Sequence, residues 1–137
     1  MKDLVYTDKI NDKTFIIIKT QNMKWEYNND EFLLYAMKIT SDAVRISHNE
    51  KVTMIADLYN FKQKNISIPF VIKFVKIFKE SFPDILEKCI IINSNSLFRH
   101  VFMLIKPFID IVTLKKIDIR KNGCNIEDYS VNVCCSK

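Results

Sequence analysis

Four short runs of aliphatic and β-branched residues alternate with amphipathic stretches that are long enough for α-helices. The runs span residues 14–19, 52–57, 89–92 and 116–120, with about a dozen or more residues between successive runs. Antiparallel neighbours can be joined by a tight turn, whereas connections of this length are typical of parallel strands joined by a helix. Such crossovers are right-handed. The alternation therefore predicts an α/β fold with a mainly parallel β-sheet and flanking helices.

Capping residues and hydrophobic periodicity locate the helices. Asp30 is the predicted N-cap of a helix that extends to about residue 46, and Ser67 is the predicted N-cap of a helix over 67–81 with a proline in its first turn. A third helix over 96–107 ends at a Lys-Pro-Phe sequence.

The second and third helices carry more apolar surface than a helix needs for packing on a sheet. Their apolar side chains cover a broad arc, while a stripe of about 100° is usually sufficient. The surplus predicts contact with another helix, with a partner or with a ligand cavity, and ordinary core packing is the commonest explanation of such a pattern. In the second helix these apolar residues are Phe70, Val71, Ile72, Phe74, Val75, Ile77 and Phe78.

Composition bounds the protein class. A chain of 137 residues with 48% hydrophobic residues fits one globular domain with a core of its own. The net charge of +5 favours anionic partners such as phospholipid headgroups, membrane surfaces or nucleic acid, although a solubilising surface is the commoner meaning of such a charge. No segment reads as a secretory signal or a transmembrane span.

Signatures of enzyme, cofactor and metal sites are absent from the sequence. The single glycine, Gly123, excludes the glycine-rich loops of nucleotide sites, and His48 and His100 lie far apart without the partners of a catalytic triad. We therefore predict a non-enzymatic protein with no cofactor and no metal site.

The cysteine pattern indicates a reducing cytoplasm. Cys134 and Cys135 are adjacent, and neither they nor Cys89 and Cys124 show zinc-ligand spacing. We predict that all of them are reduced and unmodified. Reversible palmitoylation of the adjacent pair is the alternative.

One segment is more specific than these general features. Residues 97–110 contain an apolar helix that stops at Lys-Pro-Phe, and residues 113–117 then deliver a threonine and a lysine to a strand. Upstream, the turn Phe82-Pro83-Asp84 precedes the strand 90–92. In this order and spacing, the segments resemble a CRAL-TRIO domain, the lipid-binding fold of the phosphatidylinositol and phosphatidylcholine transfer proteins. The resemblance runs from about residue 14 to residue 120 and implies an apolar cavity under a gate helix.

The resemblance implies a headgroup site. In the phosphatidylinositol-binding branch, a Tyr-Pro-Glu turn offers a carboxylate to the inositol hydroxyls, and a Thr-x-x-Lys-Ile segment offers a hydroxyl and an ammonium to the phosphate. The matching residues are Asp84, Thr113 and Lys116, and Asp84 reaches one methylene less far than a glutamate. A turn cap, a strand-entry cap and a solvated lysine are the alternative roles of these three residues.

The resemblance also implies which side chains face the ligand and the membrane. Arg99 and Lys106, seven residues apart on one stripe of the gate helix, are the predicted membrane contacts. The predicted cavity side chains are apolar, with two wall residues from the second helix and the rest from the gate helix: Phe74, Phe78, Phe98, Val101, Phe102, Ile105 and Phe108.

Two positions depart from the family pattern in an interpretable way. The family strand matching 52–57 ends in Asp-x-x-Gly, where the aspartate forms a turn. Here Asp57 is followed by Asn60 at the glycine position, and asparagine tolerates the left-handed backbone. We therefore expect a structural role for Asp57. Where the family has Asn-x-Pro before the gate helix, Asn95 or Ser96 can still serve as its cap.

Together these features predict a single CRAL-TRIO-like domain over 1–137, with a divergent tail at 121–137 and no preceding helical module. It would bind, and transfer or present, a phosphatidylinositol-type phospholipid or another small hydrophobic ligand. The expected location is the cytoplasm with transient membrane contact, and no nucleic-acid partner is expected. The alternative is a protein-protein interaction module that keeps a compact, divergent CRAL-TRIO fold without lipid transfer.

Overall fold

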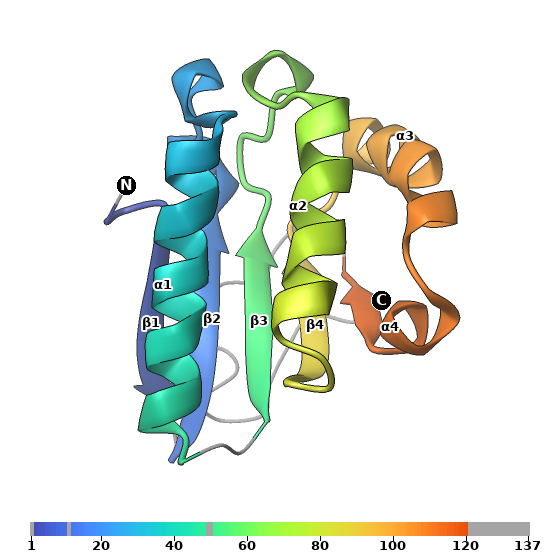
Figure 1. Cartoon of the computed structure of the whole chain (residues 1–137). Helices are drawn as coiled ribbons and strands as arrows, with labels where there is room; N and C mark the ends of the chain where they lie inside the picture. Colours follow the sequence, from blue (N-terminus) through green and yellow to red (C-terminus); the bar gives the residue numbers. More distant parts are fainter. Residues whose placement is uncertain (1, 11, 49–50, 121–137) are drawn as a thin grey trace.

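The computed structural model contains a five-stranded sheet with the strand order β1-β2-β3-β4-β5 (Figure 1). It describes residues 2–10, 12–48 and 51–120. The β1 strand is antiparallel to β2, and every later neighbour pair is parallel. The predicted mainly parallel α/β fold is confirmed. The strands are β1 (Val5–Ile10), β2 (Lys13–Lys19), β3 (Val52–Asp57), β4 (Leu86–Ile92) and β5 (Ile117–Ile119).

The helices that connect β2 to β5 lie on one face of the sheet. Each right-handed crossover moves the chain by one strand in the same direction, so each connecting helix is deposited on the same side. Figure 1 shows α1 and α2 next to each other in front of the sheet, with α3 and α4 on the flank beyond α2. The helices are α1 (Asp30–Ile46), α2 (Ile68–Ser81), α3 (Ser96–Ile105) and α4 (Ile111–Lys115), with short 3-10 turns η1 (Thr20–Asn22), η2 (Trp25–Tyr27), η3 (Gln63–Asn65) and η4 (Lys106–Phe108).

Most predicted boundaries agree with the structure. The α1 helix covers the predicted residues, and the Ser67 side chain caps α2 by accepting a hydrogen bond from the Phe70 backbone N–H at 3.4 Å. The N-cap of α1 is Asn29, whose side chain accepts from the Phe32 N–H at 2.9 Å. The prediction of Asp30 as the cap was therefore wrong by one residue. Asp30 instead occupies the first turn, where its negative charge interacts favourably with the positive end of the helix dipole.

Two elements were missed by reading the sequence. The β1 strand mixes charged and apolar residues and is held by antiparallel pairing with β2, in which Val5 lies opposite Ile18. The short α4 helix follows the gate helix, because Asp110 caps it and accepts a hydrogen bond from the Thr113 backbone N–H at 3.2 Å. The predicted gate helix also ends earlier than expected, at Ile105, and its Lys-Pro-Phe sequence forms η4.

The turn after β3 takes the predicted form. Asn60 has a left-handed φ of 59°. The Asp57 carboxylate accepts hydrogen bonds from the Tyr59 backbone N–H at 3.0 Å and from the Asn93 side-chain amide at 2.8 Å. The first contact closes the turn after β3 and the second connects this turn to the residue after β4, which confirms the structural role of Asp57.

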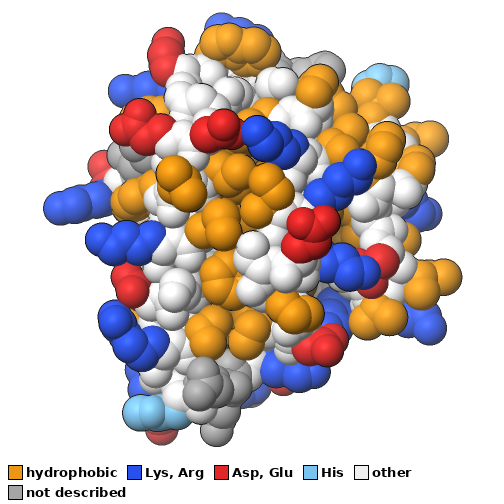
Figure 2. Space-filling view, viewed as in Figure 1, with side chains coloured by type: hydrophobic (Ala, Val, Ile, Leu, Met, Phe, Trp, Pro, Cys, Tyr) orange, Lys and Arg blue, Asp and Glu red, His pale blue; other side chains and the backbone are white. Residues whose placement is uncertain are grey.

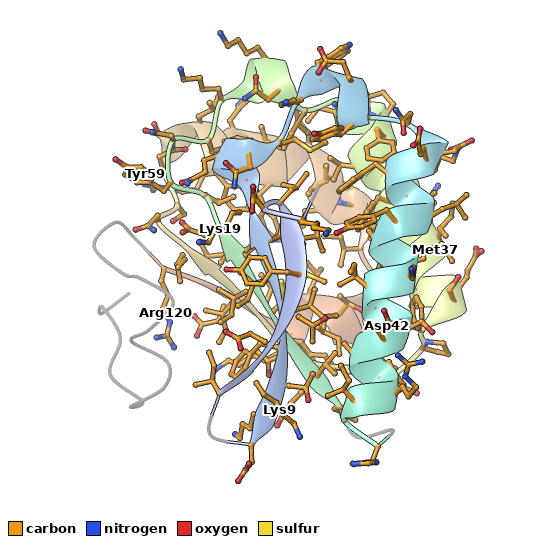
Figure 3. The ribbon with its side chains drawn as sticks, turned by 90° about the vertical axis from the view of Figure 1, so that its left-hand side faces the viewer. Lys9, Lys19, Met37, Asp42, Tyr59 and Arg120 are labelled. Carbon is orange, nitrogen blue, oxygen red and sulfur yellow. The ribbon has the colours of Figure 1, made fainter. Side chains whose placement is uncertain are left out.

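Both faces of the sheet are packed. On the helical face, one cluster joins α1 and α2 to β2 and a second joins α3 to β3, β4 and β5. In Figure 3, Met37 and Asp42 are labelled on α1, while Tyr59 and Arg120 lie on the side of the sheet away from that helix. On the opposite face a third cluster holds Phe15, Ile17, Ile55, Ile90 and Ile92, all buried.

Candidate functional site

Three side chains in register form a partly accessible floor on the helical face of the sheet. Met54 lies opposite Cys89, and Cys89 lies opposite Ile117, on the parallel strands β3, β4 and β5. All three are half-buried; Met54 and Cys89 lie on the inner strands β3 and β4, which are ordinarily sealed, while Ile117 lies on the edge strand β5. On the other face of the same strand, Ile92 is 0% exposed. The floor is therefore less tightly covered than the reverse side of the sheet.

The Cys89 thiol reveals the character of this space. Burial raises the pKa of Cys89 to about 12, because a thiolate is poorly solvated among apolar groups. The residue nevertheless keeps some accessible surface. The thiol is therefore surrounded by apolar groups, while part of the residue stays accessible.

The α3 helix covers one side of this floor. Phe98 and Val101 are buried and pack in one cluster with Ile91 of β4. Phe98 contacts Phe61 edge to face, with ring centroids 6.3 Å apart, and stacks on Phe102 at 5.8 Å. Ile105 is also buried. Of the predicted gate residues, those at 98, 101, 102 and 105 thus point inward, while Phe108 in η4 is exposed.

The predicted wall residues of α2 pack elsewhere. Phe74 and Phe78 stack with centroids 4.3 Å apart and join the cluster that contains α1, where Phe74 lies 6.2 Å from Phe32. The structure therefore does not bring them together with the α3 residues. Their aromatic surface is explained by packing between α1 and α2, the commoner meaning of an aromatic stripe on a helix.

A different stripe of α2 faces α3 and α4. Ile68 packs with the α3 cluster, and the Lys79 ammonium lies 3.0 Å from the Asp110 carboxylate that caps α4. Ile72 and Val75 fall between these two residues at helical spacing, so they share the stripe. Both are half-buried. The sequence did not single out Ile72 and Val75, because α2 is apolar around most of its circumference and its pattern does not show which side faces α3.

Exposed apolar side chains gather on the outer flank of α3, η4 and α4. Figure 2 shows apolar side chains interspersed with lysine and arginine on the right-hand flank of the molecule, where Figure 1 places α3 and α4. Arg99 and Lys106, the predicted membrane contacts, are exposed on this segment, as is His100. The exposed large apolar residues here are Met103, Leu104, Phe108, Ile111 and Val112. We call these five residues the apolar flank.

The predicted headgroup residues lie at one edge of the sheet. Asp84 is exposed in the turn just before β4, with a left-handed φ of 61°. Lys116 immediately precedes β5, and its carbonyl accepts a hydrogen bond from the Cys89 N–H at 2.8 Å. Because β4 and β5 are parallel, both residues stand at the edge where these strands begin. Thr113 lies one turn before Lys116, in α4.

Asp110 organises the polar groups at this edge. Its carboxylate accepts a hydrogen bond from the Thr113 hydroxyl at 2.6 Å and pairs with Lys79. These contacts, with the Thr113 hydrogen bond as the largest, lower the pKa of Asp110 to about 2. The Thr113 hydroxyl therefore donates to an internal acceptor, while its lone pairs can still accept. Sequence reasoning did not single out Asp110.

Comparison with known proteins identifies the family. A family model described as the CRAL/TRIO domain matches residues 6–130, which is most of the chain. The chain belongs to the CRAL/TRIO family. The predicted resemblance is thereby confirmed, and CRAL/TRIO domains bind lipophilic ligands.

Two known proteins resemble this CRAL/TRIO domain, one in sequence and one in structure. A CRAL-TRIO domain-containing protein of Schizosaccharomyces pombe is 26% identical over 80 residues, covering 58% of this chain and 18% of that protein. The crystal structure of Sfh5 matches with a TM-score of 0.75 and 20% identity, covering 92% of this chain and 51% of Sfh5. The likeness to Sfh5 shows the fold. The chain thus spans about half the length of Sfh5 and less than a fifth of the length of the Schizosaccharomyces pombe protein.

Two further observations concern the CRAL/TRIO domain as described. None of the helices in the described ranges is long and apolar enough to cross a membrane. Within residues 2–10, 12–48 and 51–120, no group of histidine, cysteine and acidic side chains is arranged to hold a metal ion. The predictions on Cys124, Cys134, Cys135 and the 121–137 tail fall outside the described residues.

Proposed function

We propose that this CRAL/TRIO domain binds a phospholipid of the phosphatidylinositol type, or another small hydrophobic molecule, without converting it chemically. The ligand would lie between the floor formed by Met54, Cys89 and Ile117 and the helices α2 and α3. We further propose that the domain transfers or presents this ligand at membranes from the cytoplasm.

The observation that carries this proposal is the state of Cys89. In a sealed core, the central residue of a floor would have no accessible surface, since protein interiors contain few voids larger than a water molecule. Cys89 is desolvated and yet accessible. An apolar chain in this space would gain about 0.8 kcal/mol for each methylene removed from water.

The headgroup would lie at the edge where β4 and β5 begin. Lys116 offers a cation to a phosphodiester, and the Thr113 hydroxyl, which donates to Asp110 at 2.6 Å, can accept a hydrogen bond from a headgroup hydroxyl within one helical turn of that lysine. Asp84 offers a carboxylate acceptor to sugar hydroxyls at the same edge. We propose these three residues as the headgroup site.

The apolar flank would make the membrane contact. Its apolar side chains are accompanied by Arg99, Lys106 and Lys115, all exposed. Exposed apolar groups next to basic residues favour the surface of an anionic membrane, where charge attraction and burial act together. The contact would be transient, because the flank belongs to short helical segments and not to a spanning helix.

Native mass spectrometry of the purified protein, followed by extraction and identification of bound lipids, tests the proposal. We expect a mass increment that matches a phospholipid or another hydrophobic ligand. Adding that ligand to stripped protein should raise the melting temperature, since it binds the folded state alone. Protein that carries no ligand, and that no phospholipid or sterol stabilises, would contradict the proposal.

A protein-interaction module is the second candidate function. The apolar flank favours it, because a large exposed apolar patch also suits a protein partner. The two functions differ in what they require of the floor. A larger side chain at Cys89 would reduce lipid binding but leave a protein complex formed through the flank intact.

A further inference from the structure

Two lysines of α2 contact the segment that leads from the gate helix to β5. The Lys76 ammonium lies 5.3 Å from the centre of the Phe108 ring in η4, and Lys79 pairs with Asp110 at 3.0 Å. The lysines are three residues apart and therefore lie on neighbouring positions of one helix surface. Together they connect α2 to residues 106–115 at two points.

This segment is only partly buried, and Ile109, Thr113 and Leu114 are half-buried. Neither η4 nor α4 contains a fully buried residue, and Ile111 is 70% exposed. Among the described residues, the Lys79–Asp110 contact is the one ion pair that joins 106–115 to another element. The segment therefore depends on its contacts with α2 to a degree that a buried helix would not.

The acceptor of the ion pair is fixed in place. Asp110 receives both the hydroxyl and the backbone N–H of Thr113, at 2.6 and 3.2 Å, which holds its carboxylate toward Lys79. The Lys79 side chain is 56% exposed and the Asp110 side chain 28% exposed, so water screens the pair. A contact of this kind favours the closed arrangement only a few-fold, roughly two- to fivefold. The Lys79–Asp110 contact therefore favours the closed arrangement of residues 106–115 but still breaks frequently.

We propose that Lys76 and Lys79 form a clasp that holds residues 106–115 closed against α2, and that the clasp slows the entry and exit of ligand by lowering the fraction of open protein. The second part rests on the proposed function, because it assumes that a ligand occupies the space behind this segment. The clasp itself is a property of the ligand-free protein.

Hydrogen exchange measured by mass spectrometry on stripped protein tests the clasp. Lys79→Met keeps the aliphatic side chain and removes the charge, and Asp110→Asn keeps a residue that can cap α4. We expect each variant to raise exchange of the 106–116 amides by roughly two- to fivefold. The double variant should exceed neither single variant by much, because both remove the same contact.

The matched control is Lys73→Met. Lys73 lies on the same helix and pairs with Asp30 at 2.6 Å, with a similar exposure of 51%, but this pair connects α2 to α1. We expect no change in exchange over 106–116 for this variant. If Lys79→Met matches wild type, or if Lys73→Met raises exchange over 106–116 equally, the clasp is refuted.

Uptake of pyrene-labelled phosphatidylcholine from vesicles then tests the link to ligand entry. Lys79→Met should load faster than wild type by about the same factor as its exchange increases. If exchange increases while loading stays at the wild-type rate, the clasp does not slow ligand entry and that part of the proposal is overturned. Loading of neither wild type nor variant by any lipid, with exchange still increased, would support the clasp and refute the proposed function instead.

Discussion

A larger side chain at Cys89 should stabilise the protein if this residue faces an empty space, and should destabilise it if the residue lies in a packed core. The Cys89→Leu substitution adds two heavy atoms to a side chain at the centre of the floor. Cys89 is half-buried and desolvated, and its neighbours across the sheet, Met54 and Ile117, are also half-buried. If the space in front of them is empty in the ligand-free protein, the larger side chain enters it without strain.

The expected magnitude follows from the area that becomes buried. Each buried methylene contributes about 0.8 kcal/mol, so two added carbons should stabilise the ligand-free protein by about 1–2 kcal/mol. Inserting the same carbons into a close-packed core would cost about 1–3 kcal/mol, because side chains would be forced off their preferred rotamers. The two cases differ in sign and by at least about 2 kcal/mol, a difference well within measurement.

Urea denaturation of stripped protein measures this difference, and a thermal melt gives a second reading of roughly 3–5 °C per kcal/mol for a domain of this size. Val52→Leu provides the control. Val52 is buried in the α1–α2 cluster, so adding one methylene there should destabilise the protein. The same Cys89→Leu protein should also take up less lipid, because its side chain occupies part of the ligand space.

Destabilisation by Cys89→Leu comparable to that of Val52→Leu would contradict an empty space in front of Cys89. It would mean that the accessible surface of Cys89 does not mark a hollow, and the proposed ligand space would lose its main support. Stabilisation with unchanged lipid uptake would place the ligand elsewhere in the domain.

Three further predictions follow from the site. Lys116→Ala should weaken binding to phosphatidylinositol vesicles by about 1.5–3 kcal/mol, and Thr113→Val should weaken it less. Equal binding of wild type and Lys116→Ala to phosphatidylinositol, phosphatidylserine and phosphatidylcholine would remove Lys116 from the headgroup site. Met103→Ser should reduce sedimentation with anionic vesicles while changing the free energy of unfolding by less than about 0.5 kcal/mol, since Met103 is 72% exposed; unchanged sedimentation would argue against the flank as the membrane contact. The pKa of Asp110 is lowered from an ordinary 3.8 to about 2, so its contacts stabilise the fold above about pH 4 and lose this effect as the pH falls toward 2. An NMR titration of the carboxyl that gives an ordinary midpoint would contradict its contacts with Thr113 and Lys79.

The order of the elements could be read from the sequence because it depends on local information. Strand runs, helix caps and crossover lengths predict a parallel sheet, and right-handed connections then leave little choice of topology. Ser67 and Asn60 act within a few residues of where they stand, and so does Asp57 in its contact with Tyr59; each has the role that was predicted.

The site depended on information that no local pattern contains. Helix α2 is apolar around most of its surface, so its sequence could not tell that Phe74 packs toward α1 while Ile72 and Val75 lie on the stripe toward α3. Residues 79 and 110 are far apart in the chain, and their pairing arises only when α4 folds back beside α2. The β1 strand likewise exists through its ladder with β2 more than through its own residues.

Local propensity and motif order encode the family, the alternation of strands and helices, and the residue types offered to a ligand, so all of these can be inferred from the chain alone. Folding establishes which faces meet, that Cys89 is both desolvated and accessible, and that Asp110 connects the gate segment to Lys79. The physical reason is that burial, pKa shifts and long-range pairs depend on the distance between segments that the sequence keeps apart.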